Sequence, residues 1–169
     1  MPAGDDTFRK SMRLLAGGVT IVTSAFEGKR SGLTATAVCS LALAPPRILV
    51  SINVMGSTYQ IVERSRCMSV NLLAKDHEHL AERFAAKRAA LEEDRFVYGE
   101  WKERVTGAPV LADALAALDC RVTDIIPLDT HAILIGVVED VLFGPRRPPL
   151  IHFEAGFTSV LASLSERSL

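Results

Sequence analysis

The sequence predicts one mainly β domain with short helices, arranged as a barrel rather than as a doubly wound sheet. At least six segments have the apolar alternation or the β-branched composition of strands, and only short amphipathic helices separate them. A doubly wound sheet would need a longer helical crossover between its parallel strands. The 169 residues fit a single domain over residues 1–169, which is long enough to bury a core without disulfides or a metal.

Composition and charge exclude several classes of function. The formal net charge of −1 offers no basic surface to nucleic acid or to an anionic membrane. No apolar run approaches the ~18 residues of a membrane span, and the first residues lack the apolar core of a secretory signal, so we expect a cytoplasmic protein. The histidines show no metal-binding spacing, so no metal is expected. Free thiols are favoured for the widely spaced Cys39, Cys67 and Cys120.

The chain opens with a predicted helix and a predicted β-hairpin. Residues 7–16 are expected to be helical, and a pair of glycines ends the helix. Residues 19–26 are β-branched and apolar, and the turn at residues 27–29 leads into the next strand. The apolar stripe of the helix consists of Phe8, Met12 and Leu15.

The stretch from Gly32 to Leu43 has the most informative pattern. As one β-strand, it places the hydroxyls of Thr34, Thr36 and Ser40 on the same face, against which a flat ligand could lie. A proline pair then interrupts the ladder before a second strand at residues 48–52. An ordinary strand–turn–strand is the alternative, because Thr is a common strand residue. The opposite face, expected in the core, carries Ala35, Ala37, Cys39 and Leu41.

Two short helices are predicted beyond this stretch. Ser57 is a plausible N-cap, and the free amides of the helix start with the hydroxyls of Ser57 and Thr58 could bind an anion; simple capping is the alternative. A strand at residues 67–73 follows, and Asp76 then caps the second helix. Its apolar face consists of Leu80, Ala81, Phe84 and Ala85.

The second half of the chain is predominantly strand. Residues 87–93 are charged and read as solvated surface, and residues 107–109 form a turn. Strands are then expected at residues 115–126, 132–143 and 150–154. The chain lacks a G-x-G-x-x-G fingerprint, a P-loop and a hydrolytic triad, so neither a Rossmann dinucleotide site nor hydrolysis nor phosphoryl transfer is supported.

The motif G-x-T-A-T-A-x-x-S, followed by a proline pair and S-x-N, resembles the flavin-binding segment of the short-chain flavin reductases. These are the NAD(P)H:flavin oxidoreductase components of two-component monooxygenases, such as those acting on 4-hydroxyphenylacetate. The likeness extends from Phe8 to about Val160, and residues 149–157 resemble the family pattern P-L-I-Y-F-x-x-G-Y. Here His152 and Phe157 stand where the family has tyrosines, so two phenol hydroxyls are lost.

The resemblance implies an FMN-binding split β-barrel with a Greek-key core, usually a homodimer with the flavin near the subunit interface. It implies FMN or FAD as the flavin, NADH or NADPH as the hydride donor, and transfer of reduced flavin to a separate monooxygenase component. No Arg can be assigned to bind the 2′-phosphate that NADPH carries and NADH lacks, which favours NADH as the donor. Two alternatives stay open: a flavoprotein that keeps its FMN and reduces another acceptor, such as a corrinoid or a metal complex, and a non-catalytic flavin-binding module.

The resemblance also assigns site residues. His131, in the segment Asp129-Thr130-His131, is implied to be the catalytic residue that positions the dihydronicotinamide, against the alternative of a structural or solvent-facing histidine. The nicotinamide set is His131, His152, Phe153 and Phe157. The implied flavin contacts are Leu33, Thr34, Ala35, Thr36, Ala37, Ser40, Ser51, Ile52, Asn53, Ser57, Thr58, Phe84 and Ala85.

Overall fold

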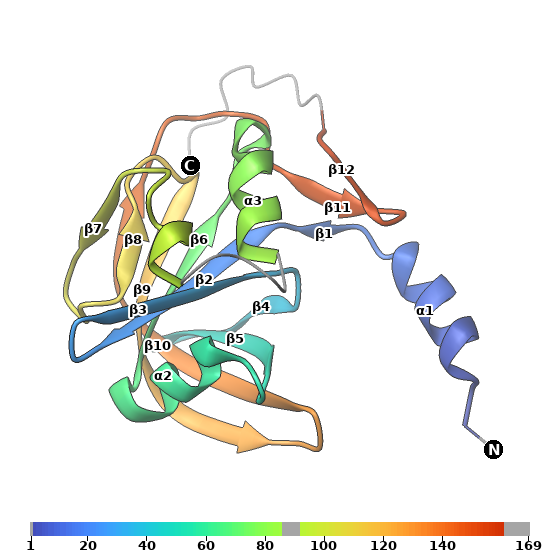
Figure 1. Cartoon of the computed structure of the whole chain (residues 1–169), viewed down its shortest axis with the longest axis horizontal. Helices are drawn as coiled ribbons and strands as arrows, with labels where there is room; N and C mark the ends of the chain where they lie inside the picture. The colour runs from blue at the N-terminus through green and yellow to red at the C-terminus, as the bar shows by residue number, and fades with distance from the viewer. Residues whose placement is uncertain (1, 86–91, 161–169) are drawn as a thin grey trace.

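A computed structural model describes residues 2–85 and 92–160 (Figure 1). It confirms a mainly β fold with short helices. The helical elements are α1 (Asp5–Arg13), α2 (Ser57–Ser65), η1 (Lys75–His77), α3 (Glu78–Ala85) and α4 (Glu92–Arg95). The strands are β1 (Gly17–Gly18), β2 (Thr20–Phe26), β3 (Lys29–Ala35), β4 (Val38–Leu43), β5 (Pro46–Asn53), β6 (Cys67–Leu72), β7 (Trp101–Glu103), β8 (Pro109–Leu111), β9 (Ala116–Pro127), β10 (His131–Phe143), β11 (Ile151–Phe153) and β12 (Gly156–Thr158).

The main sheet is a curved antiparallel sheet of seven strands in the order β3-β2-β6-β9-β10-β5-β4. Its two edge strands, β3 and β4, are consecutive in the chain and are joined only by Thr36 and Ala37. This short link brings the opposite edges of the sheet together, so the sheet curls into a barrel that is not closed by a ladder between β3 and β4. The Ala37 carbonyl accepts a hydrogen bond from the Ser51 amide, which fastens the link to β5.

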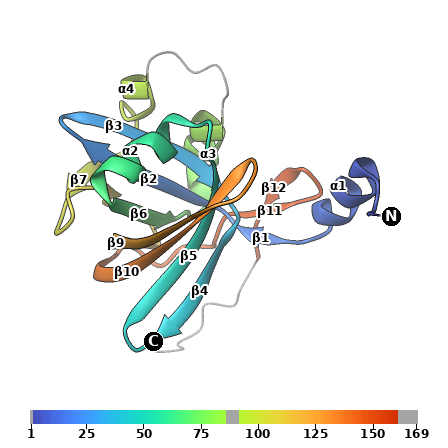
Figure 2. The ribbon, with the colours of Figure 1, turned by 90° about the horizontal axis from the view of Figure 1, so that it is seen from below.

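The prediction of one continuous strand from Gly32 to Leu43 is wrong. The strand breaks at Thr36 and Ala37, and its second half becomes the exposed edge strand β4. Of the predicted core positions Ala35, Ala37, Cys39 and Leu41, only Ala35 is buried. The reason is topological: β4 has β5 as its neighbour on one side, and the β4–β5 hairpin extends away from the rest of the barrel (Figure 2).

Two clusters of buried side chains form the core. One fills the barrel interior and includes Val22, Val50 and Met68. The other lies between the sheet, α3 and β8, and includes Phe84 and Leu111. Buried polar groups between them are satisfied: the side chain of Asn71 donates to the Ile21 carbonyl at 2.9 Å and accepts from the Leu111 amide at 2.8 Å.

Smaller elements surround the barrel. β7 pairs with β8, and a separate sheet has the order β1-β11-β12. The second predicted helix begins at Glu78 rather than beside Asp76, because residues 75–77 form a 3₁₀ turn. The predicted charged surface over residues 87–91 lies outside the described residues, and α4 follows it. Helix α1 stands beside the small sheet, away from the barrel (Figures 1 and 2), and none of its residues is buried.

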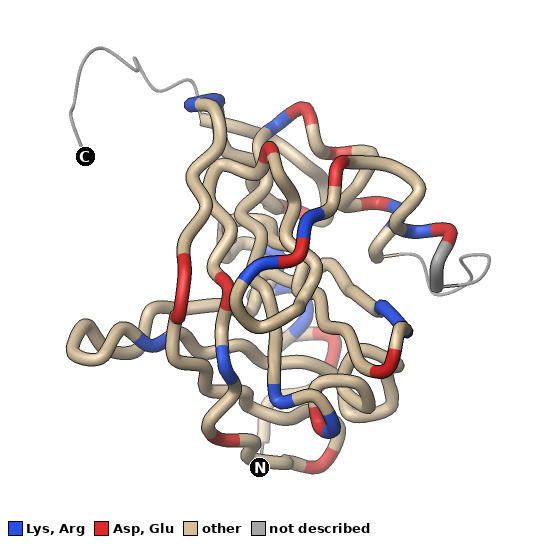
Figure 3. Tube along the Cα trace, turned by 90° about the vertical axis from the view of Figure 1, so that its left-hand side faces the viewer, with Lys and Arg blue, Asp and Glu red and all other residues tan. Residues whose placement is uncertain are grey.

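Charged residues are dispersed over the fold. Lys and Arg positions are mixed with Asp and Glu positions along the trace in Figure 3, in keeping with the net charge of −1. Within the described ranges, no helix combines the length and hydropathy needed to cross a membrane. The same residues contain no group of three or more His, Cys, Asp or Glu side chains placed to hold a metal ion.

Candidate functional site

A cleft of about 710 Å³ opens where the two sheet edges meet. The β3–β4 link and the end of β5 form its floor, the start of α2 lies on one side, and the ends of α3 and α4 lie on the other. Its size falls within the roughly 300–1,000 Å³ usual for small-molecule sites. The lining residues are Leu33, Thr34, Ala35, Thr36, Ala37, Ser51, Ile52, Asn53, Met55, Gly56, Ser57, Thr58, Phe84, Ala85, Arg95 and His131.

The three hydroxyls predicted on one face have three different environments. The Thr34 hydroxyl donates to the Ala81 carbonyl of α3 at 2.6 Å. The exposed Thr36 hydroxyl has no protein partner in the described chain and is available to a ligand. Ser40 lies on β4, exposed and outside the cleft, so its predicted place beside the other two is wrong. The strand ends before Thr36 and Ala37, so the alternation of side chains on which that prediction depended stops there.

The start of α2 presents a compact set of hydroxyls to the cleft. Gly56, not Ser57, is the N-cap, so the predicted cap is displaced by one residue. Ser31 Oγ lies 3.0 Å from Ser57 Oγ and 2.9 Å from Thr58 Oγ1. The amides at the helix start and the positive end of its dipole favour an anion near these residues.

The turn before α2 is tied to the start of β10. Asn53 accepts a hydrogen bond from the Met55 amide through its side-chain Oδ1, at 2.8 Å, so this oxygen already has a protein donor. Asn53 is also paired across the ladder with His131. The exposed His131 ring is 2.9 Å from the Thr130 hydroxyl through Nδ1. These contacts place His131 at the mouth of the cleft, beside the turn.

The opposite wall consists of α3, α4 and an aromatic cluster behind them. Phe84 is only 2% exposed, and its ring centroid lies 5.2 Å from that of Phe96 and 5.5 Å from that of Trp101. Arg95 donates from Nη1 to the Gly32 carbonyl at 2.8 Å, which attaches α4 to β3. Gly32 is needed at this contact, since a Cβ there would lie 2.7 Å from a ring carbon of Phe84.

Arg95 is a cleft residue that the sequence analysis missed. It lies two residues beyond the charged run at residues 87–93, and no motif quoted for the family includes it. Arg95 and His131 are the basic side chains among the described residues that line the cleft, and no carboxylate lines it. The cleft is therefore electrostatically suited to an anionic ligand, and its small polar floor suits a flat one. A flavin with a terminal phosphate has both properties, so the residues present fit this cofactor.

Three residues of the predicted nicotinamide set lie next to the cleft but do not line it. His152, Phe153 and Phe157 belong to the small sheet, with 5.9 Å between the ring centroids of His152 and Phe157. His152 is paired with Gly17 of β1. A Cβ on Gly17 would lie 3.2 Å from Thr36 Cβ, so the small sheet abuts the rim of the cleft.

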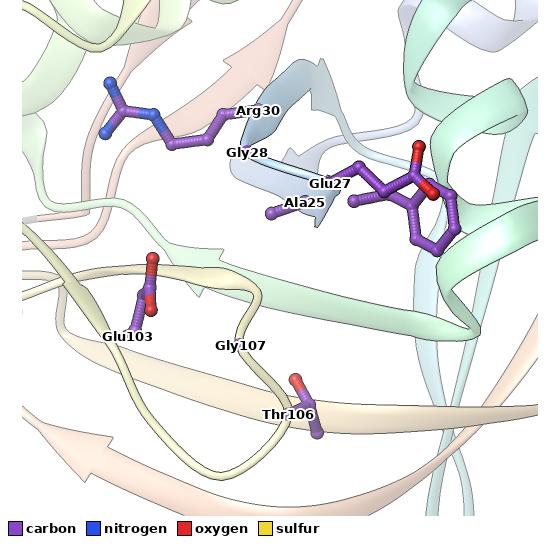
Figure 4. Close-up of a pocket in the computed structure, with 8 residues that line it drawn as sticks. Ala25, Glu27, Gly28, Arg30, Glu103, Thr106 and Gly107 are labelled. Carbon is purple, nitrogen blue, oxygen red and sulfur yellow. The ribbon is translucent and has the colours of Figure 1, made fainter.

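A second cavity, of about 550 Å³, lies between the β2–β3 hairpin and the loop joining β7 to β8 (Figure 4). It carries charges of both signs from Glu27, Arg30 and Glu103. The Arg30 guanidinium lies 4.6 Å from the centre of the Phe96 ring, which connects this cavity to the aromatic cluster. None of the residues predicted to bind flavin or nicotinamide lines it.

Comparison with known proteins identifies the family. The family model described as "Flavin reductase like domain" matches residues 12–161. The chain is similar to "FMN reductase (NADH) RutF" of Ancylobacter novellus, with 37% identity over 92% of this chain and 84% of that protein. The corresponding protein of Agrobacterium fabrum is 40% identical over 86% of this chain and 83% of its own length. The solved structure of BorF, the flavin reductase component of a bacterial two-component tryptophan halogenase, is 25% identical, with a TM-score of 0.85 over 93% of this chain and 98% of that one. The chain therefore belongs to the flavin reductase family that its sequence motifs resemble.

Proposed function

We propose that this protein uses NADH or NADPH to reduce FMN or FAD and releases the reduced flavin to a separate monooxygenase component. The observation that carries the proposal is the cleft itself: apart from Ser40, every residue expected to contact flavin lines it. The names of the similar proteins from Ancylobacter and Agrobacterium favour NADH and FMN. The two-component halogenase reductase supports delivery of flavin to a partner enzyme. We place this delivery in the cytoplasm.

In this proposal, the cleft residues bind and orient the flavin. The Thr36 and Ser51 hydroxyls, which have no protein partner in the described chain, donate to the ring from the floor. Arg95 and the start of α2, with Ser57 and Thr58, hold the phosphate from opposite sides of the cleft. When bound, the flavin supplies N5 as the acceptor for a hydride from nicotinamide C4.

His131 and the small sheet are assigned to the nicotinamide. His131 lies at the mouth of the cleft, where it can position the dihydronicotinamide without giving up a proton in the same step. Phe157 and His152 pack edge to face on the sheet that abuts Thr36, and Phe153 lies beside them on β11. His152 and Phe157 share one face of the small sheet and provide an aromatic surface at the rim, whereas Phe153 points to the opposite face.

We also propose a homodimer. Phe8 and Met12 lie on one face of α1, and Leu15 follows two residues after the end of this helix. All three are exposed, and the edge strand β4 exposes Leu41 and Leu43. Apolar side chains gathered on two projecting elements of one chain are typical of a surface that another subunit covers. Because β4 continues from the link that floors the cleft, a second copy packed there would lie near the flavin.

Anaerobic stopped-flow mixing of the protein, NADH or NADPH, and FMN, FAD or riboflavin tests the function directly. Catalysed bleaching of the visible flavin absorbance, with NADH oxidation that increases with added free flavin, is the expected result. A protein that purifies yellow and exchanges flavin slowly would favour reduction of another acceptor by a retained FMN. Flavin binding without bleaching would leave a non-catalytic module, and no turnover with any flavin would remove the proposal.

His131→Ala tests the assignment of the donor site. We expect KM for NADH to rise about tenfold, in line with the loss of roughly 1.4 kcal/mol of binding, while the Kd for FMN changes little. His79→Ala is the matched control, because His79 is an exposed histidine outside the cleft. An unaltered KM for NADH would remove His131 from the donor site.

A further inference from the structure

The contact between Thr34 and α3 is one of three that attach a wall of the cleft to β3. The Thr34 hydroxyl donates to the Ala81 carbonyl at 2.6 Å, and two further contacts join the same stretch of β3 to this wall. Arg95 of α4 donates to the Gly32 carbonyl, and the Phe84 ring packs where Gly32 has no side chain. The wall that carries Phe84, Ala85 and Arg95 is therefore attached to the strand that lines the cleft floor.

The hydrogen bond made by its hydroxyl distinguishes Thr34 from Thr36, two positions along the chain. A Thr hydroxyl has a single proton to donate, and the proton of Thr34 is taken by the Ala81 carbonyl. The Thr36 hydroxyl is exposed and has no protein partner in the described chain. Two threonines that the motif treats alike thus have different tasks: one can donate to a ligand, and the other holds the wall.

We propose that Thr34 is a positioning residue, which fixes the distance between α3 and β3 and thereby the width of the flavin cleft. It acts on the flavin through Ala81, Phe84 and Ala85 rather than by donating to the ring. The inference rests on the proposed binding of flavin in this cleft. It implies that loss of the hydroxyl loosens α3 before any ligand is present.

The test compares Thr34→Val, which keeps the shape and the strand preference but removes the donor, with Thr34→Ser, which retains it. Amide hydrogen exchange over α3 is measured in the flavin-free protein. The Kd for FMN is measured by quenching of flavin fluorescence, and the emission of Trp101, the one tryptophan of the chain, reports on the neighbouring Phe84. Thr36→Val serves as the direct-donor comparison. Thr23→Val removes a similar buried bond, to the Pro109 carbonyl, at a residue that does not line the cleft.

We expect Thr34→Val to speed exchange over α3 and to weaken FMN binding about fivefold, the effect of one lost hydrogen bond. At saturating FMN, kcat should stay near the wild-type value while KM for FMN rises. Thr34→Ser should restore both exchange and affinity. Thr36→Val should weaken FMN binding without changing exchange over α3, and Thr23→Val should change neither.

Three results would overturn the inference. Weaker FMN binding by Thr34→Val with unchanged exchange over α3 would make Thr34 a direct flavin ligand. Faster exchange with unchanged FMN affinity would make its bond structural alone. No change in either would remove any role. If the wild-type protein itself fails to bind FMN, the proposed function fails, which is a different result from wild-type binding that the variant leaves intact.

Discussion

The cleft and the small sheet beside it differ in how completely one chain builds them. The cleft has a floor, two walls and an aromatic backing, all supplied by strands and helices that pack on one another. The small sheet has short strands and the adjacent helix α1, in which none of the residues is buried. Under the proposed function, a single subunit would supply the flavin cleft, whereas the rim proposed for the nicotinamide would be completed by another subunit or by the bound donor.

The largest effect is expected where the cleft wall meets its floor. Gly32→Val places a side chain 2.7 Å from Phe84, in a contact that cannot relax without moving α3. We expect a loss of about 3 kcal/mol in the free energy of unfolding, measured by urea titration, and loss of FMN binding.

Gly18→Val in the small sheet is the matched control, because nothing lies within 4 Å of a Cβ at that position. Its free energy of unfolding should stay within about 0.5 kcal/mol of the wild-type value. Equal destabilisation by the two substitutions would mean that the cleft and the small sheet are packed alike.

The second-largest effect distinguishes binding of the flavin phosphate from binding of the flavin ring. Arg95→Met should weaken FMN binding by about 1.5–3 kcal/mol, because a charge-assisted contact to the phosphate is lost. Riboflavin, which has no phosphate, should bind the variant and the wild-type protein alike. The ratio of the FMN affinity to the riboflavin affinity is measured by fluorescence titration. It separates the contribution of Arg95 to phosphate binding from its structural hydrogen bond to the Gly32 carbonyl.

Arg83→Met removes a cation from α3 outside the cleft, where the guanidinium lies 4.2 Å from the centre of the Tyr98 ring. It should leave the preference for FMN over riboflavin unchanged. A parallel loss of both flavins in Arg95→Met would show that Arg95 holds the wall and not the phosphate.

Substitutions in α1 and just after its end should affect the cleft less and act mainly on the proposed dimer. The combined variant Phe8→Glu and Leu15→Glu alters side chains that are 58% and 66% exposed, so the free energy of unfolding of a single subunit should change by less than about 0.5 kcal/mol. Sedimentation velocity should nevertheless show a monomer in place of the proposed dimer. Lys10→Glu changes the polar side of the same helix and should leave the dimer intact. An unchanged sedimentation coefficient in the double variant would exclude α1 from the interface.

Most of the residues that line the cleft could be predicted from the motif, but the contacts that hold its walls in place could not. The order of strands and short helices follows from local patterns, and the resemblance brought the residues of the β3–β4 link, the α2 start and the α3 end to one site. The separation of Ser40 from Thr34 was missed because alternation looks the same in an enclosed strand and in an exposed edge strand.

The role of individual side chains depends on contacts between distant segments. Arg95 was not predicted as a cleft residue, because its bond to the Gly32 carbonyl joins residues far apart in sequence. The engagement of the Thr34 hydroxyl by Ala81 is likewise a long-range contact. The small sheet could not be placed from sequence either, since His152 is brought near Thr36 only by its pairing with Gly17.

The smallest effect concerns the cluster that fastens the small sheet to the barrel. Asp113 lies 3.1 Å from His77 Nε2 through Oδ2, and Arg147, just ahead of β11, also contacts it. Burial raises the pKa of Asp113, but the hydrogen bond with His77 and the charges of His77 and Arg147 outweigh burial and hold the pKa below its ordinary value. This carboxylate therefore stabilises the fold above its unfolded pKa of about 4, and the contribution is lost as the pH falls through the lower folded pKa.

Asp113→Asn should flatten this acid dependence. Between about pH 5 and pH 3, the variant should lose roughly 0.5 kcal/mol less stability than the wild-type protein, since the side chain is half exposed and solvent screens the contact. Asp129→Asn, in the exposed turn before β10, should leave the acid limb unchanged. At pH 7, Asp113→Asn should speed amide exchange in residues 150–158 and leave exchange in the cleft residues as it is. Faster exchange in both regions would show that the small sheet and the cleft are stabilised as one unit. That result would contradict the difference in packing between the two regions.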